Sequence, residues 1–327
     1  MVKLGNYIKT IDAHTMGEAA RIVVEGIPIT QGKTMMDKKQ YMQSEMDNLR
    51  KLLMHEPRGH LNMFGAILTQ PYNSGCDLGV LFMDSGGYLN MCGHGTIAAV
   101  TIAINQGIID KKDIVHLDTP SGVVECHVTY ENEKVSEVSF INVPAFVLKR
   151  NVSVLVKDVG SVTLDISFGG SFFAIVDANQ FNLKLDIDEQ DEIARLGVAI
   201  RKAVNEQLEI AHPEIPAIDS VDLVEFSLQV GEYHYKNTVV FGDGQIDRSP
   251  CGTGTCAKLA TLDIEIGSEI IQESIIGSKF KGSIVNFTEV QGIKAIIPKI
   301  TGSAWMTGIH QFSLDDTDPY EEGFLLK

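Results

Sequence analysis

Two cysteines in this 327-residue chain stand in closely similar sequence surroundings. Cys92 lies in residues 91–96 (MCGHGT), and Cys251 lies in residues 249–255 (SPCGTGT). An apolar run containing alanines follows each stretch, so each cysteine is predicted to stand at the mouth of a Gly-rich turn that opens a buried helix. Two thiols in matched positions point to acid–base or nucleophilic chemistry.

The start of a helix is a natural site for an anion. Its first N–H groups have no partner in the helix and its dipole is positive there, while glycines allow close approach of a ligand. A carboxylate could therefore be held by two short backbone cradles, formed by Gly93, His94 and Gly95 and by Gly252, Thr253 and Gly254. The same fields are expected to lower the pKa of both thiols, Cys92 and Cys251.

Two such thiols predict a specific reaction. If they flank a small amino acid, one thiolate removes the Cα proton and the other thiol supplies a proton to the opposite face, which inverts the stereocentre. No pyridoxal or metal motif is evident, so no cofactor is expected, and the carbanion is stabilised by the helix termini in a dry cavity. A hydrolytic dyad of Cys92 and His94 is disfavoured, because it also needs an oxyanion site and an orienting third group.

The composition excludes several other classes of function. A net charge of −16 disfavours nucleic acid and anionic membranes as partners. Five scattered cysteines do not form a disulfide framework, and Cys76, Cys126 and Cys256 are expected to be buried structural residues. The N-terminal residues show no secretory pattern, so a cytoplasmic location is expected.

Features of the first half recur in the second. Asp12 and Asp165 are 153 residues apart, and Cys92 and Cys251 are 159 apart. Predicted helices at 37–55 and 188–208 are similarly spaced, and strands are predicted at 64–69, 78–83, 172–176, 222–229 and 235–241. The expected fold is α+β, with two pseudo-symmetric halves, each a strand-rich, barrel-like sheet around a central helix, and the active site in the cleft between them.

We expect domain boundaries that follow this repeat. The first half takes residues 1–145 and contains the helix after Cys92, and the second takes 146–305 and contains the helix after Cys251. Residues 306–327 are expected to form a C-terminal segment that returns to the first half.

The two cysteine stretches resemble the signature motifs of the proline racemase family. Residues 12–18 (DAHTMGE) resemble its N-terminal motif, and residues 165–173 and 298–302 are also similar. The resemblance covers essentially the whole chain and is strongest to the clostridial-type members. It implies a diaminopimelate-epimerase-like fold and a cofactor-independent homodimer.

The resemblance also implies roles for individual residues. Cys92 and Cys251 would alternate as base and acid, and Asp247 would bind the ring ammonium group. The carboxylate would be bound mainly by backbone N–H groups of Gly93, His94, Gly252 and Thr253. Aromatic side chains would surround the ring at Phe64 and Phe241.

Three functions follow as alternatives. Phe64 and Phe241 favour free proline as the substrate, because hydroxyproline epimerases tend to place polar groups at the ring. Epimerisation of 4-hydroxyproline at C2 is the first alternative, since an apolar site does not strongly reject an added hydroxyl. A non-catalytic amino-acid-binding protein is the second alternative to proline racemisation. The 3-hydroxyproline dehydratases typically have threonine where this chain has Cys251, which argues against that activity.

Overall fold

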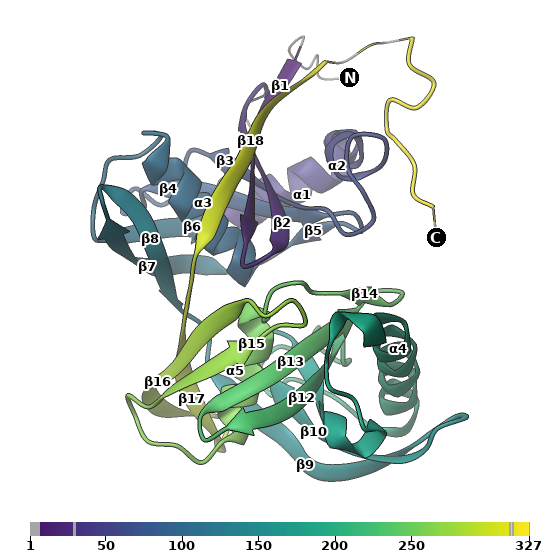
Figure 1. Cartoon of the computed structure of the whole chain (residues 1–327). Helices are drawn as coiled ribbons and strands as arrows, with labels where there is room; N and C mark the ends of the chain where they lie inside the picture. The colour runs from purple at the N-terminus through teal and green to yellow at the C-terminus, as the bar shows by residue number, and fades with distance from the viewer. Residues whose placement is uncertain (1–6, 29–30, 314, 316, 327) are drawn as a thin grey trace. The chain divides into compact units, whose positions relative to one another are not determined.

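A computed structural model describes residues 7–28, 31–313, 315 and 317–326. Figure 1 shows the elements in chain order. The chain divides into two compact units: unit 1 comprises Met1–Phe140 with Ser303–Lys327, and unit 2 comprises Ile141–Gly302.

In the described part of the chain, two of the α-helices begin with a side chain that accepts a backbone N–H, and the others do not. The bounds are Met35–Glu45 (α1), Asp47–Met54 (α2), Gly93–Asn105 (α3), Gln190–Gln207 (α4) and Gly252–Thr261 (α5), with short 3-10 turns at Ala178–Phe181 and Ile187–Glu189. The side chain of Thr34 caps α1 by accepting the Asp37 N–H. The single helix expected at 37–55 is wrong, because Met46 leaves helical geometry (φ −135°, ψ 18°) between α1 and α2.

Unit 1 is built on a sheet that mixes parallel and antiparallel pairs. Its strands are Tyr7–Thr15 (β1), Glu18–Glu25 (β2), Phe64–Thr69 (β3), Leu78–Asp84 (β4), Tyr88–Leu89 (β5), Ile114–Thr119 (β6), Gly122–Glu131 (β7), Lys134–Ile141 (β8) and Ala304–Ser313 (β18). The order β18-β1-β2-β3-β4-β6-β7-β8 is antiparallel except at β2–β3 and β4–β6, which are parallel. The C-terminal strand β18 therefore completes unit 1.

Unit 2 has a sheet that closes on itself. Its strands are Ala145–Val156 (β9), Gly160–Phe168 (β10), Phe172–Asp177 (β11), Leu223–Gly231 (β12), His234–Phe241 (β13), Gln245–Ile246 (β14), Glu269–Glu273 (β15), Lys279–Val290 (β16) and Ile293–Gly302 (β17). The order β9-β10-β11-β12-β13-β15-β16-β17 returns to β9, and only β11–β12 and β13–β15 are parallel.

The two units share one topology. The parallel pairs fall at the same two places in each strand order, and the short strands β5 and β14 each precede a Cys-headed helix. The predicted α+β class, with two similar halves of barrel-like sheet around a central helix, is confirmed. The predicted strands at 64–69, 78–83, 172–176, 222–229 and 235–241 correspond to β3, β4, β11, β12 and β13.

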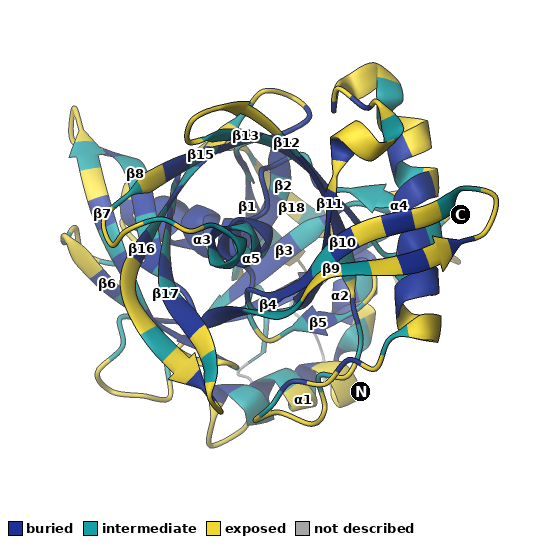
Figure 2. Ribbon diagram, turned by 90° about the horizontal axis from the view of Figure 1, so that it is seen from below, coloured by how far each residue is buried: buried dark blue, intermediate teal, exposed yellow. Residues whose placement is uncertain are grey.

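Each central helix is enclosed by the strands of its own unit. Every residue of α3 except the last, Asn105, is buried, and Figure 2 shows dark-blue ribbon along the strands around it and around α5. A helix that is apolar on all sides must lie inside the core, so α3 cannot be a surface helix. In the described part of the chain, no helix is long and apolar enough to cross a membrane.

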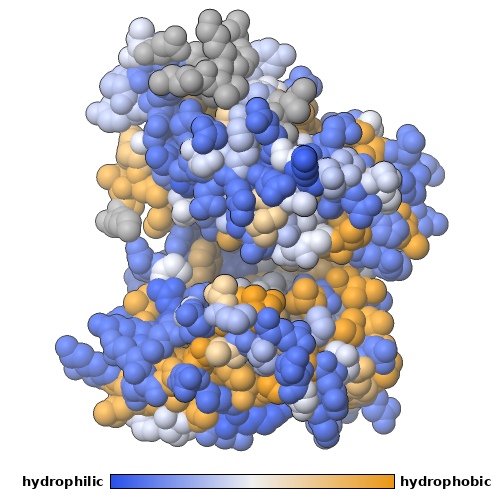
Figure 3. Space-filling view, turned by 180° about the vertical axis from the view of Figure 1, so that it is seen from behind, coloured by the Kyte–Doolittle hydropathy of each residue, from blue (hydrophilic) through white to orange (hydrophobic). Residues whose placement is uncertain are grey.

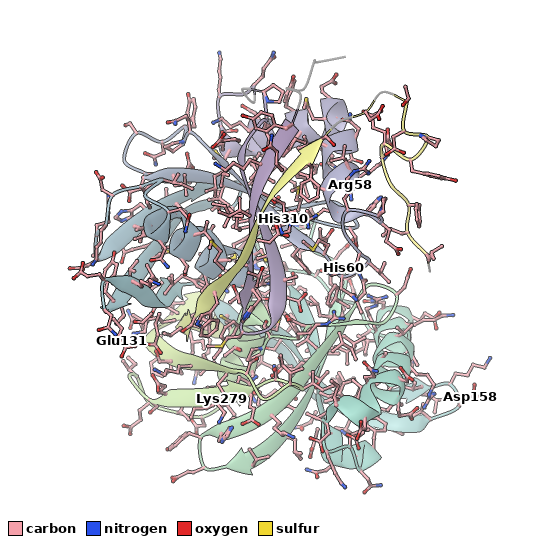
Figure 4. All side chains as sticks on the ribbon, turned by 45° about the horizontal axis from the view of Figure 1, so that its top comes forward. Arg58, His60, Glu131, Asp158, Lys279 and His310 are labelled. Carbon is pink, nitrogen blue, oxygen red and sulfur yellow. The ribbon has the colours of Figure 1, made fainter. Side chains whose placement is uncertain are left out.

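The face of the molecule drawn in Figure 3 is mostly polar: hydrophilic side chains predominate on it, and hydrophobic ones form smaller patches. Within unit 1, the C-terminal residues contact Arg58, which is labelled in Figure 4 and whose Nη2 donates to the Asp318 carboxylate at 2.5 Å. His310, also labelled there, lies on β18 with its Nε2 3.5 Å from the Asp12 carboxylate.

Candidate active site

The first thiol stands at the start of α3. Cys92 is the N-cap residue, with extended backbone geometry (φ −148°, ψ 119°), and is 8% exposed. Its Sγ lies 3.4 Å from Nδ1 and 3.9 Å from Nε2 of His94. The N–H groups of Gly93 and His94 belong to the first turn, where a helix provides no acceptor for them. The expected thiol at a helix mouth is present in unit 1.

His94 is held from two sides. Its backbone carbonyl accepts the Thr15 hydroxyl at 2.8 Å, and its ring meets Phe64 edge-on with centroids 4.6 Å apart. Burial lowers the pKa of His94 to about 4, although a backbone hydrogen bond involving Ala19 opposes that shift. The imidazole is therefore neutral at neutral pH, and it can offer Cys92 a single N–H donor or a single lone pair.

The second thiol stands at the start of α5, on an unusual backbone. Cys251 is the N-cap residue with φ +61° and ψ 111°, a region that residues with side chains rarely adopt, and is 7% exposed. Its Sγ accepts the Gly254 N–H at 3.4 Å and lies 3.6 Å from the Thr253 hydroxyl. Strain of this kind costs of the order of 1–3 kcal/mol, so the surrounding contacts must enforce it.

Those contacts come from the loop before α5. Asp247 is 8% exposed, and its Oδ1 accepts both the N–H and the hydroxyl of Ser249 at 2.8 Å. The Ser249 Oγ in turn accepts the Cys251 N–H at 3.1 Å, and the Asn237 amide donates to the Pro250 carbonyl at 2.7 Å. Together these bonds fix the turn that presents Cys251.

The environment of Cys251 reverses the expected shift of its pKa. Burial raises the pKa of this thiol well above its ordinary value, and the Asp247 carboxylate raises it further. The Thr253 hydroxyl and the Gly254 N–H lower the pKa, but by less. The prediction of a lowered pKa, made from the helix dipole alone, is therefore wrong for Cys251.

The rest of α5 is seated by close packing. A Cβ on Gly169 would stand 2.3 Å from the Thr253 carbonyl oxygen, so only glycine fits where the β10–β11 turn meets the helix. The Asn142 amide donates to the Gly169 carbonyl at 2.8 Å and to the Cys256 Sγ at 3.3 Å. The conspicuous Gly-rich turn after β10 thus positions the second cysteine.

The candidate residues fall into two sets, one in each unit. Unit 1 carries Cys92, Gly93, His94 and Phe64, and unit 2 carries Cys251, Gly252, Thr253, Asp247 and Phe241. Within unit 1, contacts join Cys92, His94 and Phe64. Within unit 2, the loop joins Asp247 to Cys251, whereas Phe241 ends β13 and is half-buried.

The other cysteines differ from one another. Cys126 and Cys256 are fully buried, as expected, and burial raises the pKa of Cys256 to about 12. Cys76 is only half-buried, which contradicts the expectation for it, because it lies in a turn before β4 and not in a strand.

Two buried charged residues near these elements are not marked by any sequence motif. Arg21 pairs with Asp12 in unit 1, and Glu225 lies beneath α5 in unit 2. A charged residue inside an otherwise apolar strand, as in residues 223–226 (LVEF), is the signal that could have identified Glu225.

The fold consists of two similarly built units of mixed sheet, and each unit presents a cysteine at the start of an enclosed helix. Residues 10–325 match the family described as proline racemase. The chain belongs to the proline racemase family, and it is an isomerase of the racemase class.

Individual relatives give a finer view. The chain is 48% identical to the proline racemase of Clostridioides difficile over 335 residues, with 100% of both chains covered. It is 40% identical to trans-3-hydroxy-L-proline dehydratase of Bacillus cereus, covering 99% of this chain and 100% of the relative. The solved hydroxyproline epimerase from Agrobacterium vitis, with bound trans-4-hydroxy-L-proline, is 29% identical with a TM-score of 0.89, covering 98% and 96%.

Proposed function

We propose that this enzyme interconverts L- and D-proline without a cofactor, with Cys92 and Cys251 as the two acid–base groups. The observation that carries the proposal is that both cysteines occupy the N-cap position of a helix, in a chain 48% identical along its whole length to a proline racemase. One thiolate takes the Cα proton, and the other thiol gives a proton to the opposite face. The roles exchange for the reverse reaction.

The backbone N–H groups supply the electrostatic part of the mechanism. The substrate carboxylate accepts hydrogen bonds from the first turns of α3 and α5, which include Gly93, His94, Gly252 and Thr253. Negative charge that builds on this carboxylate during proton removal strengthens those bonds in the transition state. Asp247 receives the ring ammonium group, and a cation there favours its ionised form.

Phe64 and Phe241 provide apolar contacts for the ring in this proposal. Phe64 is fixed edge-on against His94 at 4.6 Å, so a rigid aromatic wall lies beside the residue that helps to hold the carboxylate. A pyrrolidine ring without a hydroxyl suits such a wall.

The protein is further proposed to act as a homodimer in the cytoplasm. Light scattering of the purified protein measures its oligomeric state.

Epimerisation of 4-hydroxyproline at C2 is a second candidate. It is favoured by the solved epimerase with bound trans-4-hydroxy-L-proline, which shares the fold over almost the whole chain. Both reactions use the same proton transfer, so only the ring pocket separates them.

One experiment separates the candidates. Optical rotation is followed with L-proline and with trans-4-hydroxy-L-proline side by side, and Cα–H exchange in deuterium oxide is followed by NMR. The proposal expects faster turnover of proline, by about tenfold or more. Faster turnover of hydroxyproline assigns the epimerase, and binding without exchange of either Cα proton assigns a non-catalytic protein.

A further inference from the structure

A buried carboxyl lies behind the second thiol. Glu225, in β12, is 0% exposed, and its Oε1 accepts the Gln272 amide at 2.9 Å. Its Oε2 meets no donor at hydrogen-bonding geometry among the described residues. The nearby Asn237 amide instead donates to the Pro250 carbonyl at 2.7 Å, in the turn that presents Cys251. Nothing in the proposed proton transfer so far uses this carboxyl.

Gly254 brings Glu225 close to Cys251. A Cβ on Gly254 would lie 2.7 Å from Glu225 Oε2 and 3.3 Å from Cys251 Sγ. Because both atoms lie so near one point, they are no further apart than these two distances together, about 6 Å. A like charge within about 4–6 Å disfavours ionisation of a neighbouring group in a buried site.

The first thiol has a different nearest neighbour at the matching place in unit 1. A Cβ on Gly95, three residues after Cys92, would meet the Phe82 ring at 3.0 Å and the Cys92 Sγ at 3.2 Å. An aromatic ring therefore packs beside the first thiol where a carboxyl packs beside the second. The two thiols, although matched in sequence, differ in their electrostatic surroundings.

We propose that Glu225 is a positioning residue that sets the proton occupancy of Cys251. A neutral Glu225 lets Cys251 ionise and act as the base, and an ionised Glu225 keeps the proton on the thiol. The inference rests on the proposed role of Cys251 in proton transfer. It gives the two chemically identical groups different proton affinities, which a reaction that needs one thiol and one thiolate can use.

The groups around Glu225 are consistent with a titration near neutral pH. Burial raises the pKa of Glu225 to about 8, opposed by Lys258 on α5 and by the hydrogen bond from the Gln272 amide. Glu225 in turn raises the pKa of both Cys251 and Cys256, and its effect on Cys251 is smaller than that of burial or of Asp247. The expected effect is therefore a moderate one.

The test measures how fast each thiol reacts with iodoacetamide between about pH 6.5 and 9.5, with Cys92 and Cys251 separated by peptide mass spectrometry. Glu225→Gln keeps the shape of the side chain and cannot ionise. Gln272→Met removes the donor to Oε1, which also favours neutral Glu225. Glu192→Gln, in an exposed pair with Arg195 on α4, is the matched control.

At about pH 8.5, Cys251 is expected to react about threefold faster or more in Glu225→Gln than in the unchanged protein. Gln272→Met is expected to shift Cys251 the same way, while Cys92 and the Glu192→Gln control keep their profiles. A folded Glu225→Gln protein with an unchanged Cys251 profile overturns the inference, as does an equal change at Cys92. If Glu225→Gln does not fold, an unchanged or slower Cys251 in Gln272→Met overturns it.

These outcomes are separate from the test of the proposed function. A shifted Cys251 profile in a protein that exchanges neither proline nor hydroxyproline supports the role of Glu225 and rejects the proposed reaction. Full racemisation with an unshifted Cys251 profile supports the proposed reaction and rejects the role of Glu225.

Discussion

Arg21 and Asp12 form a buried ion pair in unit 1. The Arg21 Nε donates to both Asp12 oxygens at 3.1 Å, and Nη2 donates to Oδ2 at 2.9 Å, while the two side chains are 7% and 12% exposed. Nη1 donates to the Leu53 and Arg58 carbonyls at 2.6 Å, and the guanidinium lies 4.6 Å from the Phe312 ring centroid. One arginine therefore ties β2 to β1, the end of α2 and β18.

Arg21→Met is expected to reduce the free energy of unfolding by about 3–5 kcal/mol, because it leaves the Asp12 carboxylate buried without its partner. Urea unfolding followed by circular dichroism measures this. Lys9→Met breaks the exposed Lys9–Glu25 pair on the same two strands and should change stability by less than about 1 kcal/mol. Equal losses of stability in the two variants would show that the buried ion pair stabilises the fold no more than the exposed pair does.

Gly254→Ala tests the packing behind Cys251. The added methyl group would lie 2.7 Å from Glu225 Oε2, so α5 or the carboxyl must move, and we expect a loss of about 1–3 kcal/mol in stability with a large loss of activity. Gly87→Ala is the matched control, because nothing lies within 4 Å of its Cβ position. Thermal unfolding and racemisation assays of both variants decide the point; a fully active Gly254→Ala enzyme contradicts the close packing.

The sequence predicts the repeated parts of this fold well, for a local reason. Apolar runs bounded by Gly and Pro fix the strands, and the Gly-rich stretches after Met91 and Ser249 fix the starts of α3 and α5. The break at Met46 is not predictable in this way, because Met42, Met46 and Leu49 keep helical spacing across it. Propensity and periodicity do not contain the tertiary packing that ends α1 there.

The electrostatics of the site depend on residues that are distant in sequence. The donor to buried Glu225 is Gln272, 47 residues later, and the Asn142 amide donates to Cys256 across 114 residues. A helix-dipole argument leaves out burial and the nearby Asp247 carboxylate, so it predicts the wrong direction for the pKa of Cys251. Burial and Asp247 outweigh the two local donors there.

Glu225 should make the stability of the protein depend on pH. Its pKa is about 8 in the folded state and near its ordinary value of 4.5 in the unfolded chain, so between these pH values the folded state holds a proton that the unfolded chain has lost. Stability from this group is therefore present at low pH and falls as pH rises from about 4.5 to 8, by of the order of 4 kcal/mol.

Glu225→Gln removes that dependence, because the amide does not titrate. Urea unfolding at about pH 5.5 and 8 should show a smaller decrease in the free energy of unfolding for the variant than for the unchanged protein. Glu192→Gln serves again as the exposed control. Identical pH dependence in all three proteins would mean that Glu225 is ionised in the folded state.

The pH profile of racemisation follows from the same surroundings. The pKa of Cys251 is raised, so kcat/KM for proline should still be rising above neutral pH as the required thiolate forms, and should fall once both thiols are ionised. His94, with a pKa of about 4, stays neutral through this range and should contribute no inflection near pH 6.5. Initial rates across about pH 5–10 test this, and an inflection near 6.5 that disappears in His94→Asn would contradict it.

The two-thiol mechanism makes the strictest prediction. Cys92→Ser and Cys251→Ser should each lower kcat for racemisation by about 10²–10⁴-fold, because a hydroxyl is a far weaker acid than a thiol and does not supply the anionic base. Cys76→Ser, at the half-buried cysteine, is the control and should retain near-full activity.

Circular dichroism establishes that each variant is folded, and deuterium exchange at Cα is measured beside racemisation. Loss of racemisation in both variants, with exchange retained from only one enantiomer in each, would identify the thiol that serves each face. Near-full racemisation in either single variant would show that the substituted cysteine takes no part in the proton transfer.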